Sequence, residues 1–300
     1  MDLNVANLNV AMQRYAAAAG LDSLEGSTPT LLAGVKFFRS SQGNCRQPLT
    51  YQSGILIMGQ GEKIIHLGEQ QVAYGPGSYL VVGVPLPLEC EARCTPDEPI
   101  LGLAVDVEPQ ALHRMVERLF PPESPLEPCR TIECGLSSTS LPAALQDACI
   151  RLLAALANES EAAILGPGLL EEILYRVLTG PNGRVLLELA HHDGHYARIA
   201  RVLERIHRDY AAALTVESLA NDAHMSISTF HRAFRQITLV SPLQYMKQIR
   251  LNKARELIHR EGRGIAEAAT LVGYNSPSQF SREYKRHFQS NPREHQLALS

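Results

Sequence analysis

Two short segments of this sequence carry side chains of the kinds that bind base edges and phosphates. They are Met225–Arg235 (MSISTFHRAFR) and Asn275–Phe288 (NSPSQFSREYKRHF). Arg can pair bidentately with guanine and Gln with adenine, whereas Ser and Thr accept either base and Lys contacts the phosphate backbone. The residues expected to face outward and do this chemistry are Ser228, Thr229, His231, Arg232 and Arg235 in the first segment, and Ser278, Gln279, Ser281, Arg282, Lys285 and Arg286 in the second. This chemistry is recognition of double-stranded DNA.

The two segments repeat one pattern. A shift of 50 residues superposes Phe230 on Phe280, and self-similarity of this kind indicates a duplicated supersecondary unit. The preceding amphipathic segments, Val216–Ala223 and Ile265–Val272, match with a shift of 49, so the second turn is one residue longer. A helix, a turn of three or four residues and a second helix form the helix-turn-helix layout. We therefore predict two such units, with reading helices at 226–236 and 276–288.

Each reading helix has its own start signal and its own buried face. Ser226 and Ser276 are natural N-caps, and Pro277 suits the first helical position. Aromatic residues four positions apart lie on one helix face and are expected in the core. They are Phe230 and Phe234 in the first helix, and Phe280 and Tyr284 in the second.

The segment between the units, Pro242–His259, has a long helical pattern. Its expected apolar stripe consists of Leu243, Met246, Ile249, Leu251, Ala254, Leu257 and Ile258. Eighteen residues at about 1.5 Å each span about 27 Å, close to the roughly 34 Å between successive major-groove openings on one face of a duplex. We therefore expect a rigid spacer that lets both reading helices of one chain occupy adjacent turns of DNA.

Charge is divided unevenly along the chain. Residues 1–195 carry 12 Lys+Arg against 22 Asp+Glu, a net charge of -10, whereas residues 196–300 carry 16 against 9, a net charge of +7. An acidic body joined to a basic part suits a polyanionic partner for the second part alone. A solvated basic surface is the alternative. The duplication and the scarcity of acids on the outward faces, where only Glu283 interrupts, favour DNA.

The front of the chain reads as a small antiparallel barrel or sandwich. Short segments rich in β-branched and aromatic residues are separated by Gly, Pro and Asn. The predicted strands are Leu32–Phe38, Ser53–Met58, Lys63–Leu67, Gln70–Tyr74, Tyr79–Val84 and Ile100–Val105. Gly68-Glu69 and Gly75-Pro76-Gly77 supply the tight reversals.

Helices are predicted on both sides of this barrel and after it. They cover Leu3–Ala19, Gln110–Phe120, Leu141–Asn158 and Leu169–Leu178. Gly180–Gly194 is expected to connect two domains, 1–190 and 196–300, because Gly and Pro open it and a His-rich polar stretch closes it. The helices at 141–158 and 169–178 are the preferred dimer surface, with completion of the domain core as the alternative.

The C-terminal part resembles the DNA-binding module of the AraC/XylS family. The resemblance is carried by MSISTFHRAF, SPLQYMKQIRLNKARELI and GYNSPSQFSREYKRHFQSNP, and it covers about Arg198–Arg293. It implies a sequence-specific transcription regulator of bacterial type. His224 departs from the Gly that relatives usually carry at the first turn, and His tolerates positive φ better than most side chains.

The N-terminal part is similar to the regulatory domain of one AraC subgroup, a cupin-like barrel followed by helices. Gly75–Pro87, Glu98–Leu101 and Glu172–Gly183 carry this resemblance, which spans roughly Thr28–Gly194. The resemblance implies a domain that binds an effector, dimerises or does both. It does not indicate which ligand is bound. The expected fold class is α+β, with an N-terminal cupin-like antiparallel β-barrel and following helices, and a C-terminal all-α domain with two helix-turn-helix units.

Two alternative functions keep the DNA-binding module. In one, cysteines of the front part (Cys45, Cys90, Cys94, Cys129, Cys134 and Cys149) sense oxidants or electrophiles, although buried, inert thiols are favoured. In the other, the front part is a cupin-like enzyme. Neither Cys90/Cys94 nor Cys129/Cys134 has zinc-site spacing, and His191, His192, Asp193 and His195 read as an exposed turn. We therefore expect no enzyme, catalytic residue, metal or cofactor.

Partners and location follow from the same features. Double-stranded DNA is the expected partner, together with a small-molecule effector of unknown binding site, RNA polymerase and a second copy of the chain. No run approaches the roughly 18 apolar residues of a membrane helix, and the N-terminus lacks the pattern of a signal peptide. We therefore expect a cytoplasmic protein that contacts no membrane.

Overall fold

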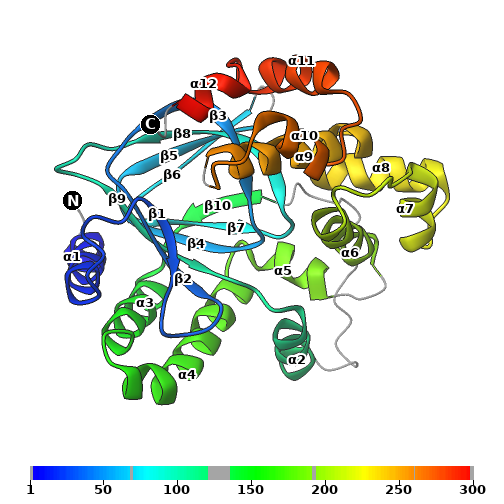
Figure 1. Cartoon of the computed structure of the whole chain (residues 1–300). Helices are drawn as coiled ribbons and strands as arrows, with labels where there is room; N and C mark the ends of the chain where they lie inside the picture. Colours follow the sequence, from blue (N-terminus) through cyan, green and yellow to red (C-terminus); the bar gives the residue numbers. More distant parts are fainter. Residues whose placement is uncertain (1–2, 68–69, 121–135, 191–193, 260, 298–300) are drawn as a thin grey trace.

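The computed structural model describes residues 3–67, 70–120, 136–190, 194–259 and 261–297. An N-terminal part of two antiparallel sheets is followed by helices and then by an all-helical C-terminal part (Figure 1). The strands are β1 Gly26–Pro29, β2 Val35–Ser40, β3 Asn44–Tyr51, β4 Gly54–Gln60, β5 Glu62–Leu67, β6 Gln70–Tyr74, β7 Ser78–Val82, β8 Leu86–Arg93, β9 Ile100–Val105 and β10 Leu136–Ser140. One sheet has the order β1-β2-β9-β4-β7-β10 and the other β3-β8-β5-β6. The predicted α+β class, with antiparallel sheets and following helices in front and an all-α part behind, is confirmed.

The sequence prediction found six of these strands and overlooked β1, β3, β8 and β10. Three of the four lie at the edges of their sheets. Edge strands tolerate Pro and polar residues because one side of the backbone is unpaired, so β1 (GSTP), β3 (NCRQPLTY) and β10 (LSSTS) lack an apolar alternation. The fourth, β8, alternates clearly but contains Pro87 near its start. The predicted reversal at Gly68-Glu69 lies outside the described residues.

Four helices of the N-terminal part lie along one side of the sheets (Figure 1). They are α1 Leu3–Ala18, α2 Pro109–Leu119, α3 Ala143–Ala155 and α4 Glu159–Leu178. α4 begins ten residues before the predicted 169 because the Asn158 side chain accepts from the backbone N–H groups of Ser160 and Glu161 and caps the helix there. Pro167 lies inside the helix.

The predicted connection at Gly180–Gly194 is wrong in part, because it contains α5 Gly183–Ala190. Val185 and Leu186 are buried there, so burial of the apolar run outweighs the Gly and Pro signals that end α4. The histidine and aspartate residues at 191–193 lie outside the described residues. Within the described ranges, no group of three His, Cys, Asp or Glu side chains could hold a metal ion.

The C-terminal part consists of helices. They are α6 His195–Arg208, α7 Val216–Asp222, α8 Ile227–Thr238, α9 Pro242–His259, α10 Ile265–Leu271, α11 Pro277–Phe288 and α12 Pro292–Leu297. One continuous apolar core runs from the sheets through α6 to α8 and reaches Ile249 in α9. A second core lies among the end of α9, α10 and α11. Of the described helices, none is both long and apolar enough to cross a membrane.

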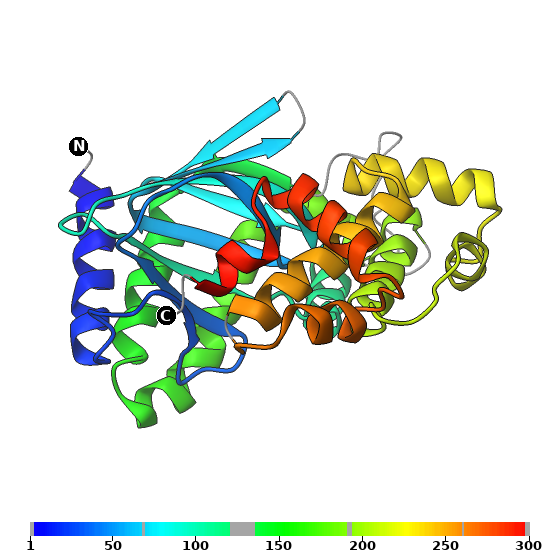
Figure 2. The same cartoon turned by 45° about the horizontal axis from the view of Figure 1, so that its top comes forward.

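The helical part packs against one side of the sheets, as Figure 2 shows. α9 covers the edge strand β3: Asn252 Nδ2 donates to Thr50 Oγ1 at 2.8 Å, and Arg255 Nη2 donates to the Pro48 carbonyl at 2.8 Å. Covering an edge strand with a helix satisfies backbone groups that would otherwise remain unpaired. The linking helix is therefore held by the β-sheet part.

Candidate nucleic-acid interface

The first helix-turn-helix unit consists of α7 and α8. Thr215 caps α7 by accepting from the Ser218 N–H at 3.1 Å, and Ser226 caps α8 by accepting from the Thr229 N–H at 3.3 Å. Ala220 in α7 is buried at 1% exposed, and its small side chain lets α8 approach closely. Phe230 and Phe234 are fully buried with ring centroids 5.4 Å apart, so the aromatic core prediction is confirmed for this unit.

The second unit repeats this arrangement in α10 and α11. Ser276 caps α11 by accepting from the Gln279 N–H at 3.3 Å, and Pro277 occupies the first turn. Ala269 is the small residue of α10, at 1% exposed. Phe280 and Tyr284 are fully buried, with centroids 5.4 Å apart. The predicted duplication is therefore a duplication of structure, including the longer second turn.

The two turns differ at one equivalent position. His224 has φ 51° in the first unit and Gly273 has φ 86° in the second, as the shift of 49 requires. A Cβ on Gly273 would lie 2.5 Å from the Ala211 carbonyl oxygen. The turn therefore demands a left-handed residue in both units and leaves no room for a side chain in the second.

Opposite stability changes are expected from substitutions at this pair. Gly273→Ala should lower the free energy of unfolding by about 3 kcal/mol, because strain at positive φ adds to the clash with Ala211. His224→Gly should raise it by up to about 1 kcal/mol by relieving strain alone. Chemical denaturation of both variants and the wild type measures the difference. Equal effects of the same sign would show that the turns are not equivalent.

The outward faces of α8 and α11 present most of the predicted residues to solvent. The exposed ones are Ser228, His231, Arg232 and Arg235 on α8, and Ser278, Gln279, Arg282, Lys285 and Arg286 on α11. Thr229 and Ser281 are only partly exposed. The Thr229 hydroxyl also accepts from the Ser226 hydroxyl at 2.9 Å, so this side chain takes part in the helix cap.

Sequence reasoning missed Ile227, the first residue of α8. Its side chain is 48% exposed beside Ser228, at the end of a reading helix that enters the major groove in helix-turn-helix proteins. An apolar side chain there can contact a thymine methyl group. The sequence did contain a signal for this residue. It is an Ile that directly follows the N-cap Ser and does not belong to the buried aromatic pair.

The linking helix α9 has the predicted bounds, but one residue of its predicted stripe is wrong. Leu243 is 62% exposed, whereas Met246, Ile249 and Ala254 are buried. Pro242 and Tyr245 are buried, so the first turn of α9 already packs against the core and Leu243 lies on its outward face. Arg250 in the middle of α9 donates to the Tyr210 and Ala212 carbonyls, both at 2.7 Å, and so ties α9 to the chain before α7.

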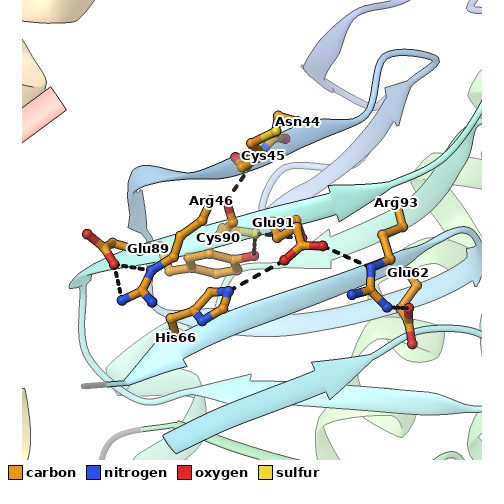
Figure 3. A network of polar contacts seen from close by, with 10 residues as sticks. Asn44, Cys45, Arg46, Glu62, His66, Glu89, Cys90, Glu91 and Arg93 are labelled. Atoms are coloured by element: carbon orange, nitrogen blue, oxygen red, sulfur yellow. Dashed lines mark hydrogen bonds and ion pairs between the residues drawn. The ribbon is translucent and has the colours of Figure 1, made fainter. Parts of the chain in front are cut away.

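The polar residues of the smaller sheet pair with one another. On its outer face, His66 lies 3.7 Å from Glu91, which also bonds Arg93 at 2.9 Å, and Arg46 pairs with Glu89 (Figure 3). The four charged side chains form a partly exposed network, beside which the His66 side chain is buried at 7% exposed. It presents no nucleophile–base pair of the kind that a hydrolase needs.

The cysteines of the described residues give little support to a reactive thiol. Burial raises the pKa of Cys90, which contacts the Tyr51 hydroxyl at 3.2 Å, and burial raises the pKa of Cys149 to about 12. Both are therefore thiols rather than thiolates at neutral pH, and the thiolate is the reactive form. Cys45 is exposed, Cys94 is half-buried, and Cys129 and Cys134 lie outside the described residues.

Comparisons with known proteins match each part of the chain. The sequence profile of the AraC-type transcriptional regulator N-terminus matches residues 31–185, more than half of the chain, and a helix-turn-helix domain profile matches residues 219–297. AlkR of Acinetobacter baylyi, an HTH-type transcriptional regulator, is 36% identical over 98 residues, which are 33% of this chain and 32% of AlkR. RclR of Escherichia coli, an RCS-specific transcriptional activator, is 34% identical over 100 residues, 33% of this chain and 35% of RclR. The match thus spans about a third of the length of these curated relatives.

ToxT of Vibrio cholerae is similar in fold over nearly the whole chain. One ToxT structure has a TM-score of 0.58 at 10% identity and covers 89% of this chain and 98% of its own. A structure of ToxT with bound unsaturated fatty acid has a TM-score of 0.56 at 12% identity and covers 92% and 98%. At these identities the likeness concerns the fold.

Proposed function

This chain belongs to the AraC-type transcriptional regulators, and from that premise we propose that α8 and α11 read two successive major grooves of one duplex. The observation that carries the proposal is the repeated unit with its exposed cationic and amide side chains over an aromatic core. Arg232 and Arg282, one in each unit, are the principal base-reading residues. Lys285 and Arg286 hold the phosphate backbone.

Selection of binding sites from a random duplex pool tests this proposal. The full chain should enrich one sequence motif with two conserved patches about one helical turn apart. Binding should weaken steeply as salt rises, because phosphate contacts release counterions. Enrichment of no motif, or of a single patch, would contradict the proposed use of both units.

We propose that a small polar molecule regulates this activity from a cavity between the two parts of the chain. The cavity, of about 710 Å³, is open to solvent on one side and is lined by residues of the edge strands β1 and β3 and of α6 and α9. Its lining consists of Ser27, Gln47, Leu49, Thr50, Gln52, His207, Tyr210, Ile249, Asn252, Lys253, Arg255, Glu256 and His259. Amides, hydroxyls and both charge signs favour a polar ligand over an acyl chain such as the one bound by ToxT.

The cavity touches residues that connect the sheets to the DNA-binding helices. Thr50 and Asn252 line it and bond each other, and Asn252 Oδ1 also lies 3.3 Å from His287 Nε2 of α11. His207 also lines the cavity and bonds Tyr245. The Tyr245 hydroxyl donates to the Pro85 carbonyl at 2.7 Å and accepts from His207 Nε2 at 2.8 Å. Burial lowers the pKa of His207 to about 4, so this histidine is neutral at pH 7. A ligand here would contact both parts of the chain.

A cavity-filling variant tests the ligand site. Leu49→Trp places a large ring in the cavity, so polar metabolites that raise the melting temperature of the wild type should no longer raise that of the variant. The measurement is thermal unfolding against a panel of sugars, amino acids and hydroxy acids, with Val10→Trp on the distant α1 as control. Equal stabilisation of wild type and Leu49→Trp would place the ligand elsewhere.

We also propose that the chain forms a homodimer through α4. Ile164 and Leu165 are 79% and 52% exposed, and Tyr175, three turns along from Ile164, is 43% exposed. Glu171, between Ile164 and Tyr175 on this helix, pairs with Arg118, and Glu172 pairs with Arg151 at 2.9 Å, so both acids have a basic partner. Exposed apolar side chains with paired charges among them suit a protein interface. α3, the other predicted dimer helix, is mostly buried.

Ile164→Glu is expected to shift the chain from dimer to monomer. A charge in place of Ile164, the most exposed of these apolar side chains, would be buried in the interface without a partner, which costs several kcal/mol and therefore lowers the dimer fraction strongly. Val10→Glu is the control. It places the same charge at an exposed apolar residue of α1, 41% exposed, and should leave the dimer intact. Analytical ultracentrifugation measures both. A dimer that survives Ile164→Glu would refute the α4 interface.

The remaining elements of the proposal follow from the family. We propose a cytoplasmic regulator with no catalytic activity, divided into domains 1–190 and 196–300, that acts on transcription by RNA polymerase. The relatives AlkR and RclR are transcriptional regulators, which supports the absence of an enzymatic role. A cupin-like character of the sheet domain is part of the same proposal.

A further inference from the structure

Glu283 is the acidic residue that interrupts the outward faces in the sequence. It lies in α11, one turn after Gln279, where a negative charge would repel a DNA backbone. Its side chain is 19% exposed and is turned toward α9 and the preceding turn. The position of this carboxylate needs an explanation beyond solvation.

Three donors hold the Glu283 carboxylate. Lys247 Nζ of α9 lies 2.8 Å from Oε1, and the Tyr274 hydroxyl of the turn donates to Oε2 at 2.8 Å. Gln279 Nε2 donates to Oε1 at 3.4 Å. Partial burial alone raises the pKa of Glu283, but these hydrogen bonds and the charge of Lys247 outweigh it and hold the pKa below its usual value. Glu283 is therefore ionised at neutral pH, with its charge balanced by Lys247.

The contact with Gln279 constrains a base-reading side chain. An amide has two N–H donors and one oxygen acceptor, and the Glu283 bond uses one donor. The other N–H and the oxygen remain, which are the groups needed for adenine N7 and for the adenine N6 amino group. With its N–H fixed by Glu283, Gln279 cannot exchange its amide nitrogen and oxygen by rotation without losing that bond.

We infer that Glu283 is a positioning residue, which orients the Gln279 amide for bidentate recognition of adenine. The inference rests on the proposed reading face of α11. Lys247 and Tyr274 fix the carboxylate, and the carboxylate fixes the amide before DNA arrives. Pre-organisation of this kind lowers the entropy lost on binding and increases discrimination between bases.

This role and a purely electrostatic role predict opposite results. If Glu283 only repelled phosphates, its removal would strengthen binding to every duplex. If it positions Gln279, Glu283→Ala should reduce the preference for adenine at one base pair about tenfold. Glu283→Gln removes the charge but keeps an acceptor oxygen for Gln279, so it should retain most of that preference.

The experiment measures binding of the full chain to the selected operator and to its three variants at the base pair read by Gln279. Gln279→Ala defines that base pair by losing its preference. Glu283→Ala should cause about the same loss, and the double variant should show less than a further twofold change, because both act through one contact. Glu267→Ala, which removes an acid of α10 that pairs with Arg263, is the matched charge control and should leave the preference unchanged.

A second measurement needs no variant at position 283. With wild-type protein, 7-deazaadenine removes the N7 contact and purine removes the N6 contact, and each should weaken binding about fivefold. Loss from only one analogue, or from neither, would show that the amide is not held for both contacts and would overturn the inference. An unchanged preference in a folded Glu283→Ala variant would do the same. If Gln279→Ala itself changes no preference, the proposed reading role of Gln279 fails as well.

Discussion

Phe280→Ala is expected to unfold the second helix-turn-helix unit while the rest of the chain stays folded. Phe280 is fully buried and packs edge-on against Tyr274 at 5.3 Å and beside Tyr284 at 5.4 Å. Removing a buried Phe side chain costs about 3–5 kcal/mol. The core around Phe280 is small and separate from the main core, so a loss of this size is large compared with its stability.

Phe230→Ala is the matched control for this prediction. Phe230 occupies the equivalent position in the first unit, but it belongs to the core that continues into the sheets. Its loss should therefore lower the stability of the whole chain in one transition. Hydrogen exchange distinguishes the two results: fast exchange confined to α10 and α11 is expected for Phe280→Ala. Protection lost equally from β4 or β9 would show that the two cores unfold together.

Arg232→Ala and Arg282→Ala are each expected to weaken binding to the operator by about 1–3 kcal/mol and to blur the preference at one base pair. Both side chains are exposed on reading helices, at positions related by the shift of 50. Because the two arginines read different grooves, the losses should add, and the double variant should lose about 2–6 kcal/mol.

Lys285→Ala provides the comparison for the arginine variants. Loss of a phosphate contact should weaken binding to all sequences alike. It should lower the salt dependence of binding by about one ion and leave the base preference unchanged. Equilibrium binding to the operator and to its single-base variants, at several salt concentrations, separates the two effects. An operator affinity unchanged in both arginine variants would refute the assigned faces of α8 and α11.

Features specified by nearby residues were predictable from the sequence. The bounds of α9, the N-caps Ser226 and Ser276 and the buried aromatic pairs depend on spacing within one or two helical turns. The duplication strengthened these predictions, because each unit provided an independent instance of the same pattern. The left-handed conformation of His224 agrees with the resemblance to the AraC/XylS family, whose members usually carry Gly at this turn.

Features that depend on contacts between distant segments were not predictable in this way. The edge strand β3 contains Pro48 and few apolar residues, and it is covered by a helix that follows it by about 200 residues in the sequence. The exposure of Leu243 depends on which face of the first turn of α9 packs against the core, and Pro242 and Tyr245 are buried there instead. The role of Glu283 depends on Lys247, 36 residues earlier, and that ion pair forms only when α9 and α11 pack together.

Hydroxyl-radical footprinting on the shortest selected operator tests the central claim most directly. One chain with two reading helices should protect two segments about 10 base pairs apart on one face of the duplex, and Phe280→Ala should remove one of them. A single protected segment in the wild type, unchanged by Phe280→Ala, would contradict the account, since α11 would then not contact DNA.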